Sequence, residues 1–163
     1  MLDQARGRVE AWPLDGVGFR DGLLRSYRRG RRAWRAARDE PSAEHLHEWR
    51  KRVKDLWYHL SLLEEAWKPV MAALADEAHE LSDRLGDDHD LAVLWDWAGE
   101  HAPSPDLEPL IDERRRRLQH DAFAYGARLY ADKPRVFVDR VERWWDASAG
   151  DAIIESSQPR RAA

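Results

Sequence analysis

Four arginines near the start of the chain are spaced so that a helix would carry them along one ridge. They follow one another at steps of three, four and three residues: Arg25, Arg28, Arg32 and Arg35. Like charges at these spacings repel one another, and few acidic residues lie between them. An anion would relieve this repulsion, and a guanidinium group suits phosphate because it offers a fork of hydrogen-bond donors. The pattern therefore predicts a surface for a polyanion with regularly spaced phosphates.

A second basic row follows at the same kind of spacing. Its members are His47, Arg50 or Lys51, Lys54 and Tyr58. On a helix His47 and Lys54 would lie about 10 Å apart along the axis. Lysine would supply point charges, and histidine and tyrosine would add hydrogen-bond donors. The alternative for both rows is a solvated face that pairs with acidic residues elsewhere in the chain.

A cluster of histidine and aspartate could support a different chemistry. It comprises His79, Asp83, His89 and Asp90, and these residue types bind divalent metals in phosphohydrolases. The simpler interpretation of the intervening Gly-Asp-Asp is a glycine that ends one helix and an aspartate that caps the next. The sequence also lacks a Gly-flanked nucleophilic serine and a Gly-rich phosphate loop. We therefore expect a protein that is not an enzyme and needs no metal or other cofactor.

Charge is divided unevenly along the 163 residues, although the formal net charge is only −4. Residues 20–54 carry a net charge of +7, residues 55–113 carry −14, and residues 114–163 carry +4. A strongly basic surface is thus compatible with the near-neutral total. The chain has no cysteine, which excludes thiol catalysis and disulfides. No stretch approaches the roughly 20 apolar residues of a membrane span, so we expect a cytoplasmic protein.

Apolar residues recur at helical spacing nearly everywhere, which predicts an all-α bundle of four to six helices. The bundle should occupy residues 17–147, after an N-terminal extension at 1–16 and before a disordered tail at 148–163. Ser42 is expected to cap a helix that reaches Trp67, and Gly86 to end the helix after it. The remaining helices are predicted at about 17–38, 87–98, 107–130 and from Pro134 to Trp145.

The segment from His47 to Tyr58 resembles the H-x-x-R-[basic]-x-x-K-x-x-x-Y motif of CHAD domains, which are α-helical domains that bind inorganic polyphosphate. The arginine-rich segment before it and Leu85-Gly86 with Asp90 after it follow in the order of the family's C-terminal half. The resemblance covers about residues 19–145. It implies a helical bundle whose basic residues line a groove or channel for polyphosphate.

By motif position the resemblance implies that His47, Arg50, Lys51, Lys54 and Tyr58 contact polyphosphate. Arg28, Arg32 and Arg35 follow from the preceding arginine-rich helix. The chain has one such motif and about half the length of a full CHAD domain, and Trp57 stands where the family often has a basic residue. The chain is therefore a half-length member, a fragment, or one half of a homodimer, which we favour. The resemblance further suggests association with polyphosphate granules, and nucleic acid is the less favoured partner.

Overall fold

The architecture is taken from a computed structural model, which describes residues 17–101 and 104–156. Within these ranges the chain forms five α-helices and one short 3₁₀ helix and has no strand, so the predicted all-α bundle is confirmed. The predicted extension at residues 1–16 and the last residues of the predicted tail, 157–163, lie outside the described residues. In chain order the elements are α2 (Val17–Asp39), α3 (Ala43–Leu62), η1 (Glu64–Ala66), α4 (Lys68–His101), α5 (Leu107–Leu129) and α6 (Pro134–Ser156).

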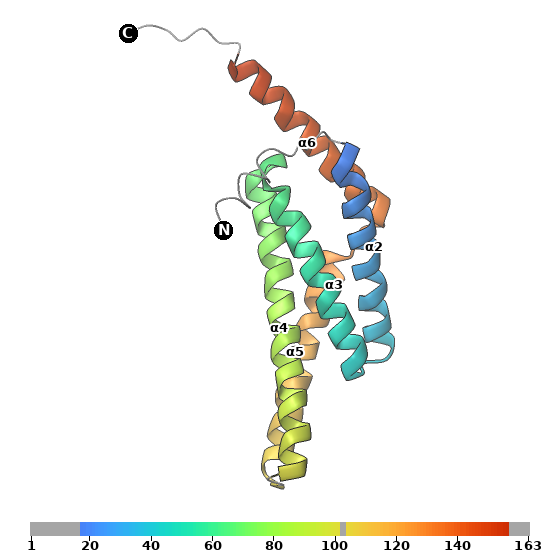
Figure 1. Cartoon of the computed structure of the whole chain (residues 1–163), viewed down its shortest axis with the longest axis vertical. Helices are drawn as coiled ribbons and strands as arrows, with labels where there is room; N and C mark the ends of the chain where they lie inside the picture. Colours follow the sequence, from blue (N-terminus) through green and yellow to red (C-terminus); the bar gives the residue numbers. More distant parts are fainter. Residues whose placement is uncertain (1–16, 102–103, 157–163) are drawn as a thin grey trace, which may run out of the picture.

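Helix α3 lies in the middle of the molecule, between α2 and α4 (Figure 1). Helix α5 runs back along α4, and α6 packs against α2 and η1. Helices α4 and α5 extend together beyond the α2–α3 pair, and the C-terminal part of α6 extends beyond the bundle in the other direction (Figure 1). Both sequence segments that carry the predicted binding residues, α2 and α3, are therefore neighbours in space.

The helix boundaries follow from capping residues and prolines. The Ser42 hydroxyl accepts a hydrogen bond from the His45 amide at 3.2 Å, as predicted for an N-cap. Pro134 is the first residue of α6, where its fixed φ angle and missing N–H cost nothing. Helix α3 ends at Leu62, before Trp67, and Trp67 lies half exposed beyond η1 rather than in the α3 stripe. Helix α6 continues to Ser156, so the first part of the predicted disordered tail is helical.

The predicted helix end at Gly86 is wrong, because α4 runs through this residue without a break and has 34 residues in all. Neither Asp87 nor Asp88 caps a new helix. Glycine inside a helix costs about 1 kcal/mol relative to alanine. Packing against α3 on one side and α5 on the other stabilises α4 at this point, and the side chain of Arg50 from α3 lies where a Cβ of Gly86 would point.

The core forms where the apolar stripe of α3 meets its neighbours. Tyr27 of α2 is buried, donates a hydrogen bond to the Leu129 carbonyl at 3.0 Å, and stacks on Phe137 of α6. Gly126 of α5 leaves room for the indole rings of Trp34 and Trp49, because a Cβ at this position would lie 2.6 Å from an atom of each ring. The buried members of the α3 stripe are Leu46, Trp49, Val53, Leu56 and Leu60.

Among the described residues, no helix combines the length and the apolar character that crossing a bilayer requires.

Candidate functional site

Helix α3 turns one side toward α4, and most of the motif residues lie there. The Arg50 guanidinium packs against Gly86, where an added Cβ would lie 3.1 Å from Nε. The His47 ring lies 4.9 Å from the His89 ring. Lys54 falls on the same side because it lies four residues after Arg50 and seven after His47. We call this surface, made by His47, Arg50, Lys54 and Trp57, the α4-facing flank.

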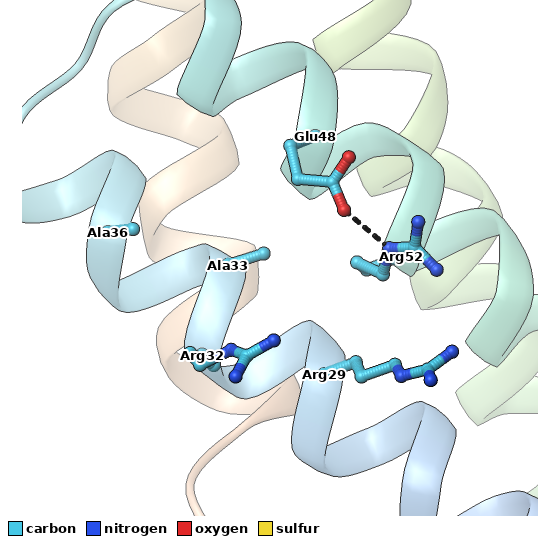
Figure 2. A pocket seen from close by; sticks show the side chains of 6 residues that line it. All are labelled: Arg29, Arg32, Ala33, Ala36, Glu48 and Arg52. Atoms are coloured by element: carbon cyan, nitrogen blue, oxygen red, sulfur yellow. Dashed lines mark hydrogen bonds and ion pairs between the residues drawn. The ribbon is translucent and has the colours of Figure 1, made fainter.

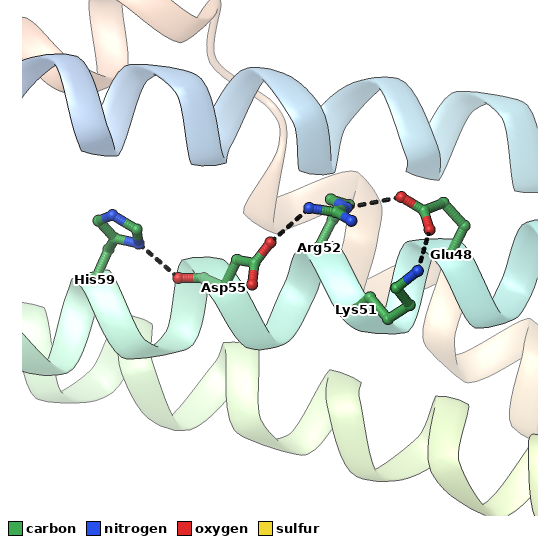
Figure 3. Close-up of polar contacts among 5 residues, drawn as sticks. All are labelled: Glu48, Lys51, Arg52, Asp55 and His59. Carbon is green, nitrogen blue, oxygen red and sulfur yellow. Dashed lines mark hydrogen bonds and ion pairs between the residues drawn. The ribbon is translucent and has the colours of Figure 1, made fainter.

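The opposite side of α3 faces α2 and holds a chain of ion pairs (Figure 3). Arg52 donates to Glu48 at 2.7 Å and to Asp55 at 2.8 Å. One turn further along, His59 lies against Gly22 of α2, where an added Cβ would be 3.3 Å from its Nε2. We call Glu48, Arg52, Asp55 and His59 the α2-facing flank. Its positive charge is offset by carboxylates of the same helix.

The α4-facing flank has no such internal compensation. Neither Arg50 nor Lys54 has a carboxylate within ion-pairing distance in the part of the chain that the structure describes. Arg50 Nε and His47 Nδ1 are buried without a hydrogen-bond partner among the described residues. These two atoms are exceptions to the rule that buried polar groups are hydrogen-bonded, and the uncompensated charge of this flank would attract an anion.

The two remaining motif residues lie at the edge of the α4-facing flank. The Lys51 ammonium donates to Glu48 at 2.9 Å, so part of its charge is already offset. Tyr58 is half exposed and stacks on Trp57, with the ring centroids 4.8 Å apart. The Trp57 ring also meets the edge of the His79 ring of α4. Trp57 therefore joins the motif helix to α4 rather than adding charge to the surface.

The predicted arginines of α2 lie on a different surface from the α4-facing flank. Arg28, Arg32 and Arg35 are exposed. Arg32 lines a cleft of about 550 Å³ between α2 and α3, which includes Glu48 and Arg52 of the α2-facing flank (Figure 2). The structure thus divides the predicted binding residues between two surfaces on opposite sides of α3.

Hydrogen bonds within the α2-facing flank shift the acidity of its members. Lys51 and Arg52 both donate to Glu48, and these bonds lower the pKa of its carboxyl group. The same bond from Arg52 to Glu48 raises the pKa of the guanidinium group. Both shifts favour the ionised pair, so Glu48 carries a full negative charge inside the cleft at neutral pH.

Comparison with known families decides the classification. Residues 13–99 match the family model of the CHAD domain. The chain belongs to the CHAD domain family. The match includes all of α2 and α3 and most of α4, so both flanks of α3 lie within the CHAD domain. The family is associated with polyphosphate binding. No curated protein and no solved structure matched the chain.

The histidine and aspartate cluster of the CHAD domain does not converge on one point. His79 and His89 lie ten residues apart on the continuous helix α4, which is about 15 Å along its axis. His79 pairs with Asp83 at 3.2 Å, whereas His89 lies beside His47. Across residues 17–101 and 104–156, no three histidine or acidic side chains come together in a way that could hold a metal ion.

Sequence reasoning missed three residues of this CHAD domain that shape its basic surfaces. Arg29 and Arg52 line the α2–α3 cleft, and Gly86 leaves room for Arg50. The spacing held a signal for Arg52, because it lies two residues after Arg50 and must point to another side of the helix. Arg29 and Gly86 carry no comparable signal, since their roles depend on how the neighbouring helix packs.

Asp88 is a structural residue of the same helix. Its carboxylate is only 2% exposed and accepts hydrogen bonds from Arg115 at 3.1 Å and Gln119 at 2.8 Å. These contacts join α4 to α5 on the side away from α3. A buried charge is tolerated when it is paired and hydrogen-bonded in this way.

Proposed function

We propose that this CHAD domain binds inorganic polyphosphate without catalysing a reaction, and that the α4-facing flank of α3 is its principal contact surface. The observation that carries the proposal is the row of His47, Arg50 and Lys54, whose basic side chains have no carboxylate partner among the described residues. A surface of this kind attracts anions and gains little from the protein's own acids. The family match supports polyphosphate as the anion.

Each residue type contributes a different kind of contact. Arg50 offers a planar fork of donors, and Lys54 offers a compact point charge. His47 and Tyr58 add hydrogen-bond donors at the two ends of the row. Lys51, which already pairs with Glu48, contributes less. Because the row runs along a helix axis, it matches a linear polymer better than a single phosphate ion.

We propose that the exposed arginines Arg28, Arg32 and Arg35 contact a longer polymer after it has passed around α3. Their own surface lies on the α2 side, so a short anion could not contact them and Lys54 together. A long chain would gain from both surfaces through effective concentration. Affinity should therefore rise with polymer length.

We further propose a homodimer in which a second copy completes the binding channel. The chain carries the basic motif once, and closed twofold symmetry would bring two copies of it together. The test is a mass measurement of the protein at low salt with and without polyphosphate, which reports binding and stoichiometry together. A monomer with and without bound polymer would refute the dimer and leave the binding proposal intact.

The binding proposal is tested with charge reversals on the α4-facing flank. Lys54→Glu and Arg50→Glu should each weaken polyphosphate binding, and both variants should keep the far-ultraviolet helical signal. Polyphosphate binding should also weaken steeply with salt, since each phosphate contact releases counterions. Undiminished binding by both variants would remove the α4-facing flank from the account.

Two other functions can be distinguished by further binding and activity measurements. Displacement of polyphosphate by DNA or RNA at comparable phosphate concentration would reduce the claim to general polyanion binding. Metal-dependent release of phosphate from polyphosphate, lost in His89→Ala, would instead make the protein a phosphohydrolase. We expect neither, because the family match favours polyphosphate over nucleic acid, and because His79 and His89 lie about 15 Å apart along the axis of α4.

A further inference from the structure

The cleft between α2 and α3 is a second basic site with a different design from the α4-facing flank. It measures about 550 Å³, and Arg29, Arg32 and Arg52 line it together with Glu48 and two alanines (Figure 2). A neighbouring hollow of about 350 Å³ shares Arg29 and Arg32 and is completed by two more arginines of α2, Arg25 and Arg28. The two hollows together form one continuous arginine-lined surface.

The arginines of α2 in this surface lack an internal counter-charge. Arg25, Arg28, Arg29 and Arg32 have no carboxylate within ion-pairing distance among the residues described here. They follow one another at the helical spacings at which like charges repel. Among the described residues that line the larger cleft, Glu48 alone carries a carboxylate. An anion in the cleft would therefore meet several unpaired guanidinium groups and one negative group.

Glu48 occupies the position of an anion on the α3 side of the cleft. Its two carboxylate oxygens accept hydrogen bonds from Arg52 at 2.7 Å and from Lys51 at 2.9 Å, as the oxygens of a phosphate group would (Figure 3). Glu48 is about half exposed, and ion pairs at such positions contribute little to stability. Its release into solvent would therefore cost little.

These observations lead to an inference that does not depend on the α4-facing flank. We propose that the α2–α3 cleft binds compact, multiply charged phosphate anions such as tripolyphosphate, and that Glu48 is an internal competitor which the anion displaces from Arg52 and Lys51. A singly charged anion would interact with Arg52 and Lys51 no more strongly than Glu48 already does. An anion with several charges contacts Arg29, Arg32 and Arg52 at once, so the cleft selects for high charge density.

The test is calorimetric titration of tripolyphosphate at low salt into the full chain carrying Lys54→Glu, which weakens the other flank. In that background Glu48→Gln should raise the affinity about three- to fivefold, because it keeps the shape of the side chain and removes the competing charge. Arg29→Gln combined with Arg32→Gln should lower the affinity about tenfold or more. Inorganic phosphate should bind far more weakly than tripolyphosphate.

Glu65→Gln is the matched control, since it makes the same change in net charge at an exposed residue beyond the end of α3. It should leave the affinity nearly unchanged. The proposal is overturned if Glu48→Gln behaves like Glu65→Gln, or if the double arginine variant binds tripolyphosphate as before. The cleft proposal would also be overturned if Lys54→Glu alone abolished all tripolyphosphate binding. That result would leave the proposal of polyphosphate binding on the α4-facing flank in place.

Discussion

The two flanks of α3 share one helix and each carries an arginine and a histidine, yet they differ in how that charge is balanced. On the α4-facing flank, Arg50 and Lys54 have no acidic partner among the described residues, and Arg50 fits over a glycine. On the α2-facing flank, Arg52 is held between Glu48 and Asp55 (Figure 3). The presence of an arginine and a histidine on both flanks does not distinguish them. The position of the carboxylates separates the flank whose cations lack an acidic partner among the described residues from the flank whose arginine is already paired.

The largest effect should come from reversing two charges on the α4-facing flank. Two reversals on the arginine surface of α2 provide the comparison. Arg50→Glu with Lys54→Glu should weaken long-chain polyphosphate binding about 100-fold or more, since a hydrogen bond to a charged group contributes about 1.5–3 kcal/mol. Arg32→Glu with Arg35→Glu should weaken it only about tenfold, because we expect these residues to contact only a distant part of a long polymer. Equilibrium titration at fixed salt measures both. Equal losses would contradict the distinction between the α4-facing flank and the arginine surface of α2.

Loss of stability at alkaline pH tests the contribution of Tyr27 to the helical core that supports both flanks. Burial raises the pKa of Tyr27 to about 12. The unfolded chain ionises this tyrosine near pH 10, so the stability that it contributes is complete below pH 10 and is lost as the pH rises toward 12. The loss should be about 2–3 kcal/mol.

Urea unfolding of the natural chain and of Tyr27→Phe at pH 9 and pH 11.5 measures this contribution. The difference in stability between the two proteins should shrink or reverse at the higher pH, because other ionising groups affect both alike. Binding to both flanks should fail together when the scaffold unfolds. A difference in stability that is independent of pH would contradict the assignment to Tyr27.

Glycine substitutions in α4 separate the effect of helix propensity from the contact with Arg50. Gly99→Ala adds a Cβ with nothing within 4 Å, and it should stabilise the protein by about 0.5–1 kcal/mol. Gly86→Ala adds a Cβ 3.1 Å from Arg50 Nε, so the guanidinium group must shift. We expect a smaller gain in stability and a severalfold weaker affinity for polyphosphate. Unchanged affinity would show that the position of Arg50 does not matter for binding.

The smallest effect should come from Lys51, which lies between the two flanks. Its charge is partly offset by Glu48, so Lys51→Gln should weaken polyphosphate binding only about twofold. Lys54→Gln, which removes an unpaired charge, should have a clearly larger effect in the same titration. Equal losses of affinity in the two variants would show that pairing with Glu48 does not reduce the contribution of Lys51 to polyphosphate binding.

The sequence predicted the helices well where capping and apolar spacing agree, as at Ser42 and Pro134. It failed at Gly86, because the local signal of a glycine followed by two aspartates is the same for a helix end and for a helix that another helix packs against. The contact with Arg50 that distinguishes the two cases is tertiary. For the same reason α4 could not be predicted as one helix.

The arrangement of the candidate binding residues was only partly predictable from the sequence. Helical spacing groups His47, Arg50 and Lys54 on one side of α3, and the structure places His47 beside His89 and Arg50 against Gly86 of α4. Helical spacing could not place Arg28, Arg32 and Arg35 relative to them, since that requires knowing which side of α3 packs against α2. In the structure Arg32 shares a cleft with Glu48 and Arg52, and Arg28 lines the neighbouring hollow. Their contact with polyphosphate stays a prediction.

The salt dependence of polyphosphate binding tests the central claim most directly. The natural chain, Lys54→Gln and Lys68→Gln are titrated with long-chain polyphosphate at several salt concentrations, and the logarithm of affinity is plotted against that of salt. Lys68 is exposed at the start of α4, outside the α4-facing flank, and serves as the matched control. We predict a steep slope for the natural chain and for Lys68→Gln, and a slope reduced by about one for Lys54→Gln. A natural chain whose binding does not respond to salt, or equal slopes for the two variants, would contradict the account.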